Sequence, residues 1–259
     1  MSTFLQGIDP ALFWQLPLLF LAGIAAGLLN VLAGGGSLLT LPLLIFMGLP
    51  SSIANGTNRV AIFFQCLFAI RGFRKRGYFP LELILLCTPP ALFGSWLGAG
   101  LAISMDDLLF KRVLGIIMIG VLVLSILDPM KRMTQDAARL GTWHKVVLFI
   151  SFFFVGVYGG FVQAGVGFII IFALLFHGLD LLRINAVKVF VVFLYTAVAL
   201  GVFVYHGQVN YSLGIGLAAG NSIGGMMAPR IAVAKGHDWI KKVVNVAVFI
   251  FAMKLLVFP

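Results

Sequence analysis

The stretch Gly27-Leu-Leu-Asn-Val-Leu-Ala-Gly-Gly-Gly-Ser-Leu-Leu-Thr-Leu-Pro42 decides the fold, because three consecutive glycines interrupt an otherwise strongly apolar run. Each glycine costs about 1 kcal/mol relative to alanine inside a helix, so Gly34–Gly36 predicts a break between two helices. In a bilayer, broken backbone is tolerated only where protein or a water-filled cavity satisfies its polar groups. Ser37 follows as the predicted N-cap of a short second helix, whose positive end and free N–H groups suit an anion.

The composition indicates an all-α integral membrane protein. Of the 259 residues, 61% are hydrophobic and only 10% are charged, whereas a soluble domain carries about 25% charged residues. The net charge of +10 comes from basic residues in short loops between apolar segments, a placement that fits the positive-inside rule and argues against nucleic acid as a partner. The cysteines and histidines share no ligand spacing, so we predict no metal site and no cofactor.

The second half of the chain repeats the first. Four landmarks recur in the same order, namely Ala33–Gly36 with Ala164–Gly167, Asn55–Asn58 with Asn185–Lys188, Gly94–Gly98 with Asn221–Gly225, and Lys111–Arg112 with Lys241–Lys242. In the first half the helices are expected at 14–32, 37–48, 53–70, 80–103 and 108–127. The chain therefore divides into a first membrane repeat (1–127), a cytoplasmic connecting loop (128–145) and a second membrane repeat (146–259). Each repeat has about five segments, of which the second is short and follows a glycine-rich break.

An odd number of segments means that the second repeat enters the membrane from the opposite side. The distribution of Lys and Arg agrees with this inverted topology. The basic loop 71–79, the connecting loop and Arg183 then fall inside. The loops 49–52 and 205–211, which lack Lys and Arg, fall outside together with both termini. The sequence thus predicts two inverted-topology repeats, a common plan among transporters.

The predicted substrate site gathers around the two glycine breaks and the polar cluster that follows each of them. Asn55, Asn58 and Arg59 share a helix face, and a polar face in a membrane helix turns inward. Lys188 is the corresponding cation in the second repeat. The alternatives are a helix cap with a cation reaching the interface for each cluster, and close helix packing for the glycines. The candidate substrate-binding residues are Gly34, Gly35, Gly36, Ser37, Asn55, Thr57, Asn58, Arg59, Gln163, Gly165, Gly167, Asn185 and Lys188.

Four further polar residues, Asn30, Ser95, Asn221 and Ser222, are less specific candidates for the same cavity. Single Ser and Asn residues also join membrane helices by hydrogen bonds. No carboxylate falls near the predicted midplane, although ion-coupled transporters usually need one to carry a proton. A uniporter-like path is therefore favoured, or a proton carried by the substrate or by Lys188.

The segments Ala26–Ser37 with Pro42, and Ala54–Asn58, resemble the sulfite exporter TauE/SafE family of bacterial membrane proteins. The resemblance covers nearly the whole chain, although Val166 interrupts the glycines of the second break. It implies export or uptake of sulfite or sulfonated organic anions such as sulfoacetate, without choosing the anion. The family's polar positions carry over only to Gly34, Gly35, Gly36, Asn55, Thr57, Asn58, Gly165, Gly167 and Lys188.

We therefore expect a transporter that is not an enzyme and that moves a small sulfur-containing anion by alternating access. It would reside in the bacterial inner membrane with both termini outside, and a homodimer is compatible with the sequence. An anion channel and a carrier of another substrate, such as a metal cation, remain as alternatives. Saturation of flux separates the channel from the carrier. A membrane-embedded enzyme would need a nucleophile, base or metal constellation at depth, and the sequence offers none.

Overall fold

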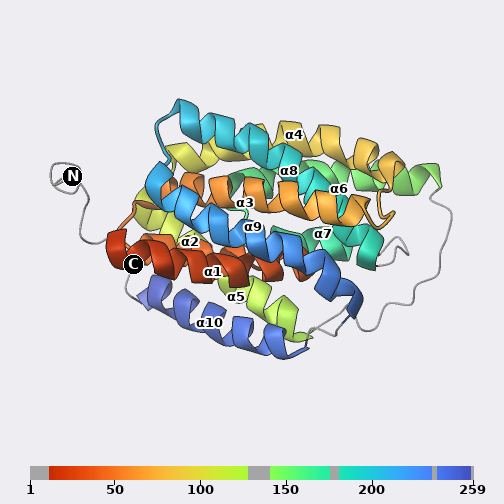
Figure 1. The fold of residues 1–259 in the computed structure, drawn as a ribbon. Coiled ribbons are helices and arrows are strands. Elements are labelled where there is room, and N and C mark those ends of the chain that lie inside the picture. The colour runs from red at the N-terminus through yellow and green to blue at the C-terminus, as the bar shows by residue number, and fades with distance from the viewer. Residues whose placement is uncertain (1–11, 128–140, 176–180, 235–237, 258–259) are drawn as a thin grey trace.

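The computed structural model describes residues 12–127, 141–175, 181–234 and 238–257, and these residues form ten helices and no strand. The helices are α1 (Leu12–Leu32), α2 (Ser37–Phe46), α3 (Ser51–Arg74), α4 (Leu81–Ser104), α5 (Asp107–Leu127), α6 (Thr142–Phe161), α7 (Val166–Leu175), α8 (Leu181–Tyr205), α9 (Tyr211–Ala234) and α10 (Asp238–Val257). Figure 1 shows them as one bundle in which most axes run in roughly the same direction or its reverse.

The observed order of helix lengths is the predicted one in both halves. The expected helices of the first half are present, and their ends are displaced by at most a few residues. Five helices, α1, α3, α4, α6 and α8, are long and apolar enough to cross a membrane, counting only the residues that the structure describes. Helix α6 begins at Thr142, so residues 142–145 of the expected connecting loop are helical. Residues 128–140 of that loop lie outside the described part of the chain.

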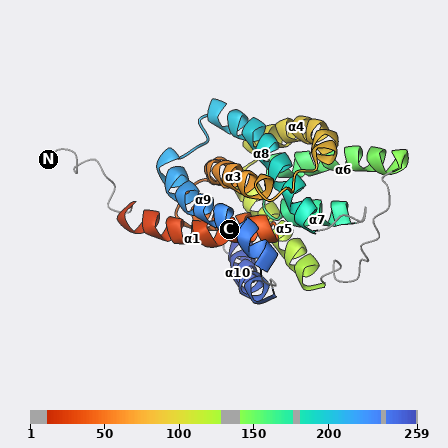
Figure 2. The same cartoon turned by 45° about the vertical axis from the view of Figure 1, so that its right-hand side comes forward.

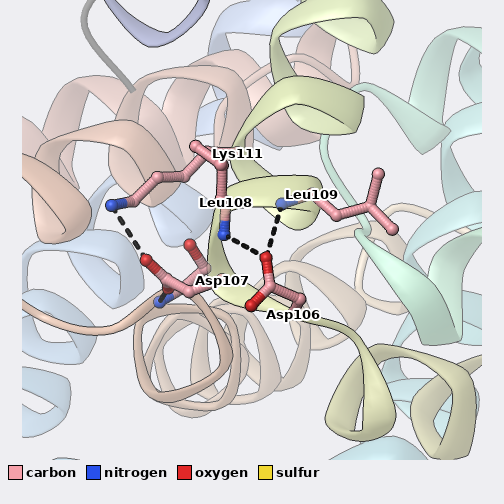
Figure 3. Close-up of polar contacts among 6 residues, drawn as sticks. Asp106, Asp107, Leu108, Leu109 and Lys111 are labelled. Carbon is pink, nitrogen blue, oxygen red and sulfur yellow. Dashed lines mark hydrogen bonds and ion pairs between the residues drawn. The ribbon is translucent and has the colours of Figure 1, made fainter.

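The first turns of α3 and α5 meet at one end of the bundle, which we call the Asp107 end. Asp106 caps α5 by accepting hydrogen bonds from two backbone N–H groups of its first turn, and Asp107 pairs with Lys111 (2.9 Å) (Figure 3). The carboxylate of Asp107 also accepts a hydrogen bond from the backbone N–H of Ser51 (2.6 Å), at the start of α3. The N-termini of α3 and α5 are thereby joined through the carboxylate of Asp107.

Hydrogen bonds assign the other loops to the two ends of the bundle. Ser52 donates to Gln208 (2.8 Å), so the loop before α9 also lies at the Asp107 end. At the opposite end, which we call the Glu82 end, Lys145 near the start of α6 pairs with Glu82 near the start of α4 (2.7 Å). The loops 49–52, 103–112 and 205–211 therefore share one end, and for 49–52 and 205–211 this agrees with the absence of Lys and Arg.

Glycine stripes allow two pairs of helices to approach closely. On α9, Gly216 meets the side chain of Leu16 on α1, and Gly220 and Gly224 lie against the backbone of Phe20 and Ile24. The contact points advance in the same direction along both helices, so α1 and α9 run in parallel. Gly94 and Gly98 bring α4 to the backbone of α6 in the same way. Such small-xxx-small spacing is typical of membrane helix contacts. Because α1 begins at the Asp107 end and α6 at the Glu82 end, the two helices that carry the glycine breaks enter from opposite ends.

Helices α3 and α8 pack against each other in the middle of the bundle, with α9 on α3 and α4 on α8 (Figures 1 and 2). Helices α5 and α10 form a separate pair below them in Figure 1, and α2 also contacts α10. The outward faces retain exposed apolar side chains such as Phe93, Phe154 and Ile215, which suits contact with lipid. Most of the buried polar residues lie instead on α3 and α8, and the others lie on α2, α4, α9 and the second break.

Candidate functional site

The two glycine breaks touch each other in the interior of the bundle. A Cβ atom on Gly34 would overlap the backbone of Gly167, and a Cβ atom on Gly167 would overlap the backbone of Gly34. Gly34 also has a φ of +83°, a conformation that side-chain-bearing residues rarely adopt. The helix pairs α1–α2 and α6–α7 therefore reach in from opposite ends and meet at their breaks.

A small cavity, with room for about one water molecule, lies beside this contact. It is lined by Asn30, Gln65, Cys66, Gln163, Val166, Gly167, Lys188, Val189 and Val192. Four of these residues, Asn30, Gln163, Gly167 and Lys188, belong to the predicted set. The lining includes one basic side chain, three carboxamides and no carboxylate.

Lys188 is the charged group of the cavity and is 2% exposed. Its ammonium donates to the backbone oxygen of Val31 (2.8 Å) and to the side chain of Asn185 (2.6 Å), which lies one turn earlier on α8. An ammonium has three hydrogens, so one donor remains for the cavity. Both partners are neutral, and no described Asp or Glu is buried beside Lys188. The site thus holds a buried basic group without a protein counter-ion.

Arg59 is buried but does not line the cavity. Its guanidinium donates to the backbone oxygens of Gly159 (3.0 Å) and Gly160 and to the side chain of Gln163 (3.2 Å), and it lies over the ring of Phe203 (4.8 Å). The last carbonyls of a helix have no partner within that helix, and Arg59 supplies one for the end of α6. Contact between Arg59 and a substrate stays a prediction.

Gln163 occupies the second break in a left-handed conformation, with a φ of 64°. Its carboxamide is engaged at both ends, because its oxygen accepts from Arg59 and its nitrogen donates to Thr196 (2.6 Å). A left-handed conformation costs roughly 1–2 kcal/mol for a residue with a side chain. These two hydrogen bonds hold Gln163 where glycine would be easier to accommodate.

The prediction that Ser37 caps α2 is wrong. Gly36 is the N-cap and has helical φ and ψ values (−57° and −38°), and Ser37 is the first residue of the helix. A side chain on Gly36 would overlap the backbone oxygen of Ala26, so close packing against α1 draws Gly36 into the turn. Among the described residues, the backbone N–H groups of Ser37 and Gly167 find no carbonyl in the turn before them. The Ser37 hydroxyl is likewise buried without a partner there.

Most of the other predicted residues lie near the contact between the two glycine breaks and join the helices around it. Asn55 donates to the backbone oxygen of Phe161 (2.6 Å), and Asn58 accepts from Thr40 (2.7 Å), which joins α3 to α2. Thr57 lies nearer the Asp107 end, where its hydroxyl accepts from the backbone of Asn210 (2.9 Å). The remaining glycines of the breaks pack tightly, Gly35 against Phe168 and Gly165 against Val121.

The four less specific candidates separate into two groups. Asn30 lines the cavity, whereas Asn221 is buried outside the lining, and both donate to the side chain of Gln65. Ser95 donates instead to the backbone oxygen of Tyr195 (2.8 Å), joining α4 to α8, and Ser222 is half-buried on α9 outside the lining.

Sequence reasoning missed Gln65 and Cys66, which place the middle of α3 in the cavity wall. The signal for Gln65 was available, because it is a lone carboxamide inside the apolar run 60–70. A polar residue at that depth of a membrane helix marks an inward face. The aliphatic wall of Val166, Val189 and Val192 carried no such signal, since valine is common throughout the chain.

Comparison with known proteins places the whole bundle in one family. Residues 19–255 match the model of the sulfite exporter TauE/SafE family. The probable membrane transporter protein ORF9 of Sinorhizobium sp is 27% identical over 248 residues, which cover 95% of this chain and 94% of that protein. A probable membrane transporter protein of Haemophilus influenzae is 27% identical (93% and 94% covered), and YfcA of Escherichia coli K12, also a probable membrane transporter protein, is 24% identical (93% and 89%). No solved structure matches the chain.

Proposed function

The chain belongs to the sulfite exporter TauE/SafE family of membrane transporters, and from that premise we propose that it carries a small sulfur-containing oxyanion across a bacterial inner membrane. Sulfite and organosulfonates are the substrates that we put forward. The observation that carries the proposal is the ammonium of Lys188, which lines a buried cavity without a protein counter-ion. A buried charge is costly unless it is paired, so an anion that enters the cavity would be stabilised by the ammonium.

The remaining polar groups of the cavity suit the same ligand. Gly167 contributes a backbone N–H near the start of α7, where the helix dipole favours negative charge. The Ser37 N–H lies at the start of α2, directly after the first break, although Ser37 is not part of the cavity lining. An oxyanion accepts hydrogen bonds from such groups, which would replace the water that it loses on entry.

We further propose that the two halves are inverted repeats and that movement of one repeat-derived unit against the other exposes the cavity to each side in turn. The opposite entry of α1 and α6 and the contact of Gly34 with Gly167 support this mechanism. The Glu82 end carries Arg71, Arg74, Lys75 and Arg76, so we assign it to the cytoplasm, and the Asp107 end, where α1 begins, to the outside.

The proposal is tested by flux into proteoliposomes that contain the purified full-length protein. Sulfite, thiosulfate, sulfoacetate, sulfate and a panel of metal cations are compared in the wild type and in Lys188→Gln. We expect saturable uptake of a sulfur oxyanion that Lys188→Gln weakens. Flux of a metal cation, or a conductance that does not saturate, would replace this proposal by one of its alternatives.

A further inference from the structure

The side-chain amide of Gln65 is oriented by two helices that flank α3. Gln65 is 1% exposed, and its oxygen accepts a hydrogen bond from Asn30 of α1 (3.1 Å) and another from Asn221 of α9 (3.4 Å). A carboxamide has an accepting oxygen and a donating nitrogen. Because two donors occupy the oxygen, the nitrogen end is the end that remains for the cavity, which Gln65 lines.

The nitrogen of Gln65 has no protein acceptor among the residues that the structure describes. Gln163, the other glutamine of the cavity, differs in this respect, since Arg59 and Thr196 engage both ends of its amide. A donor that lines a cavity and has no protein acceptor is free to bind a ligand there. Of the two glutamines, Gln65 is therefore the one with a donor to offer.

We infer that Gln65 is a specificity-determining residue of the cavity, where it and Lys188 donate hydrogen bonds to the oxygens of one bound oxyanion. The inference rests on the proposed function. Two donors facing the ligand select an oxyanion whose bound oxygens carry no proton, such as a sulfonate. An anion that presents a hydroxyl hydrogen to this wall would place a donor against a donor, a mismatch that discriminates strongly in buried sites. Asn30 and Asn221 act as positioning residues, because they hold the Gln65 amide in this orientation.

The test compares Gln65→Glu with the wild type, and it uses methanesulfonate and bicarbonate as probes. Bicarbonate carries a hydroxyl hydrogen and methanesulfonate does not. Gln65→Glu keeps the size of the side chain but replaces the donor by an acceptor. We expect the affinity for methanesulfonate to fall about tenfold or more, the scale of a hydrogen bond to a charged group. The affinity for bicarbonate should fall less, so the preference for methanesulfonate shrinks.

A second variant and a matched control separate the inference from loss of folding. Gln65→Leu removes the donor without adding charge, and should weaken methanesulfonate binding while the thermal unfolding midpoint in detergent stays measurable. Gln208→Glu makes the same chemical change at the Asp107 end, outside the cavity, and should leave both affinities within about twofold. Equal loss for both probes, or a Gln65→Glu variant that binds like Gln208→Glu, would overturn the inference. If the wild type binds and transports no anion at all, the proposed function itself fails.

Discussion

The ammonium of Lys188 on α8 lies 2.8 Å from the backbone oxygen of Val31, in the last turn of α1. Arg59 on α3 makes the reciprocal contact, because its guanidinium donates to the backbone oxygens of Gly159 and Gly160 in the last turn of α6. The last carbonyls of a helix lack partners and carry partial negative charge. Each half of the chain therefore supplies the cation that completes the broken helix of the other half.

The two cations are not equivalent, and Arg59 should matter most for stability. Arg59→Gln would leave the carbonyls of Gly159 and Gly160 buried without donors, at about 1–3 kcal/mol each, so we expect a loss of roughly 2–6 kcal/mol. Arg59→Lys should restore only part of this loss, because a point charge cannot span groups that the planar guanidinium reaches together. Denaturant unfolding in detergent micelles measures both variants.

The matched control for Arg59 is Arg112→Gln, which removes an exposed guanidinium from α5. Its unfolding free energy should stay within about 0.5 kcal/mol of the wild type. Equal stability of Arg59→Gln and Arg112→Gln would show that the end of α6 does not depend on the buried guanidinium.

Lys188 should matter most for the ligand. A hydrogen bond to a charged group contributes about 1.5–3 kcal/mol, so Lys188→Gln is expected to raise the Kd for the transported anion roughly 10- to 150-fold. Lys111→Gln, a change at the surface of the Asp107 end, should leave the Kd unchanged. Titration of the anion against the purified protein gives both values, and an unchanged Kd for Lys188→Gln would place the anion elsewhere.

The contact of Gly34 with Gly167 predicts that alanine is not tolerated at either position. Gly167→Ala places a methyl group inside the backbone of the opposite break, and Gly34→Ala adds the strain of a positive φ. We expect losses of roughly 1–3 kcal/mol for Gly167→Ala and roughly 2–5 kcal/mol for Gly34→Ala. Gly120→Ala is the control, because a Cβ atom there meets open space on α5, and this change should stabilise the helix by about 0.5–1 kcal/mol.

Local sequence signals predicted the helices and the breaks, because glycine and apolar length act on the nearest residues. Among the described loops, the absence of Lys and Arg also grouped 49–52 with 205–211, which lie at the same end of the bundle. Those signals did not predict that Arg59 would bond the end of α6 while Lys188 lines the cavity. This difference depends on which helix C-terminus lies opposite each cation, a relationship between residues about 100 and 157 positions apart. The Ser37 cap failed for the same reason, since contact of Gly36 with α1 overrode the local preference for serine.

The left-handed conformation of Gln163 predicts an unusual order of stability among its variants. Gln163→Ala and Gln163→Gly both lose the hydrogen bonds to Arg59 and Thr196, so both should unfold more easily than the wild type. Glycine adopts a positive φ without strain, so the glycine variant should exceed the alanine variant by roughly 1–2 kcal/mol. In an ordinary helix the order is reversed. Thermal unfolding of the three proteins decides between these orders.

The two cysteines provide an internal test of which surface the substrate reaches. Both cysteines are buried in the same apolar cluster, but Cys66 lines the cavity and Cys87 does not. In a Cys87→Ala background, a small water-soluble methanethiosulfonate reagent should modify Cys66 whenever the cavity opens, and a transported anion should slow that reaction by occupying the cavity. In a Cys66→Ala background, Cys87 should react slowly, and the anion should not change its rate. Mass spectrometry of the intact protein follows both reactions. If the anion slowed the reaction of Cys87, or left the reaction rate of Cys66 unchanged, the transport path would avoid the contact between the two glycine breaks.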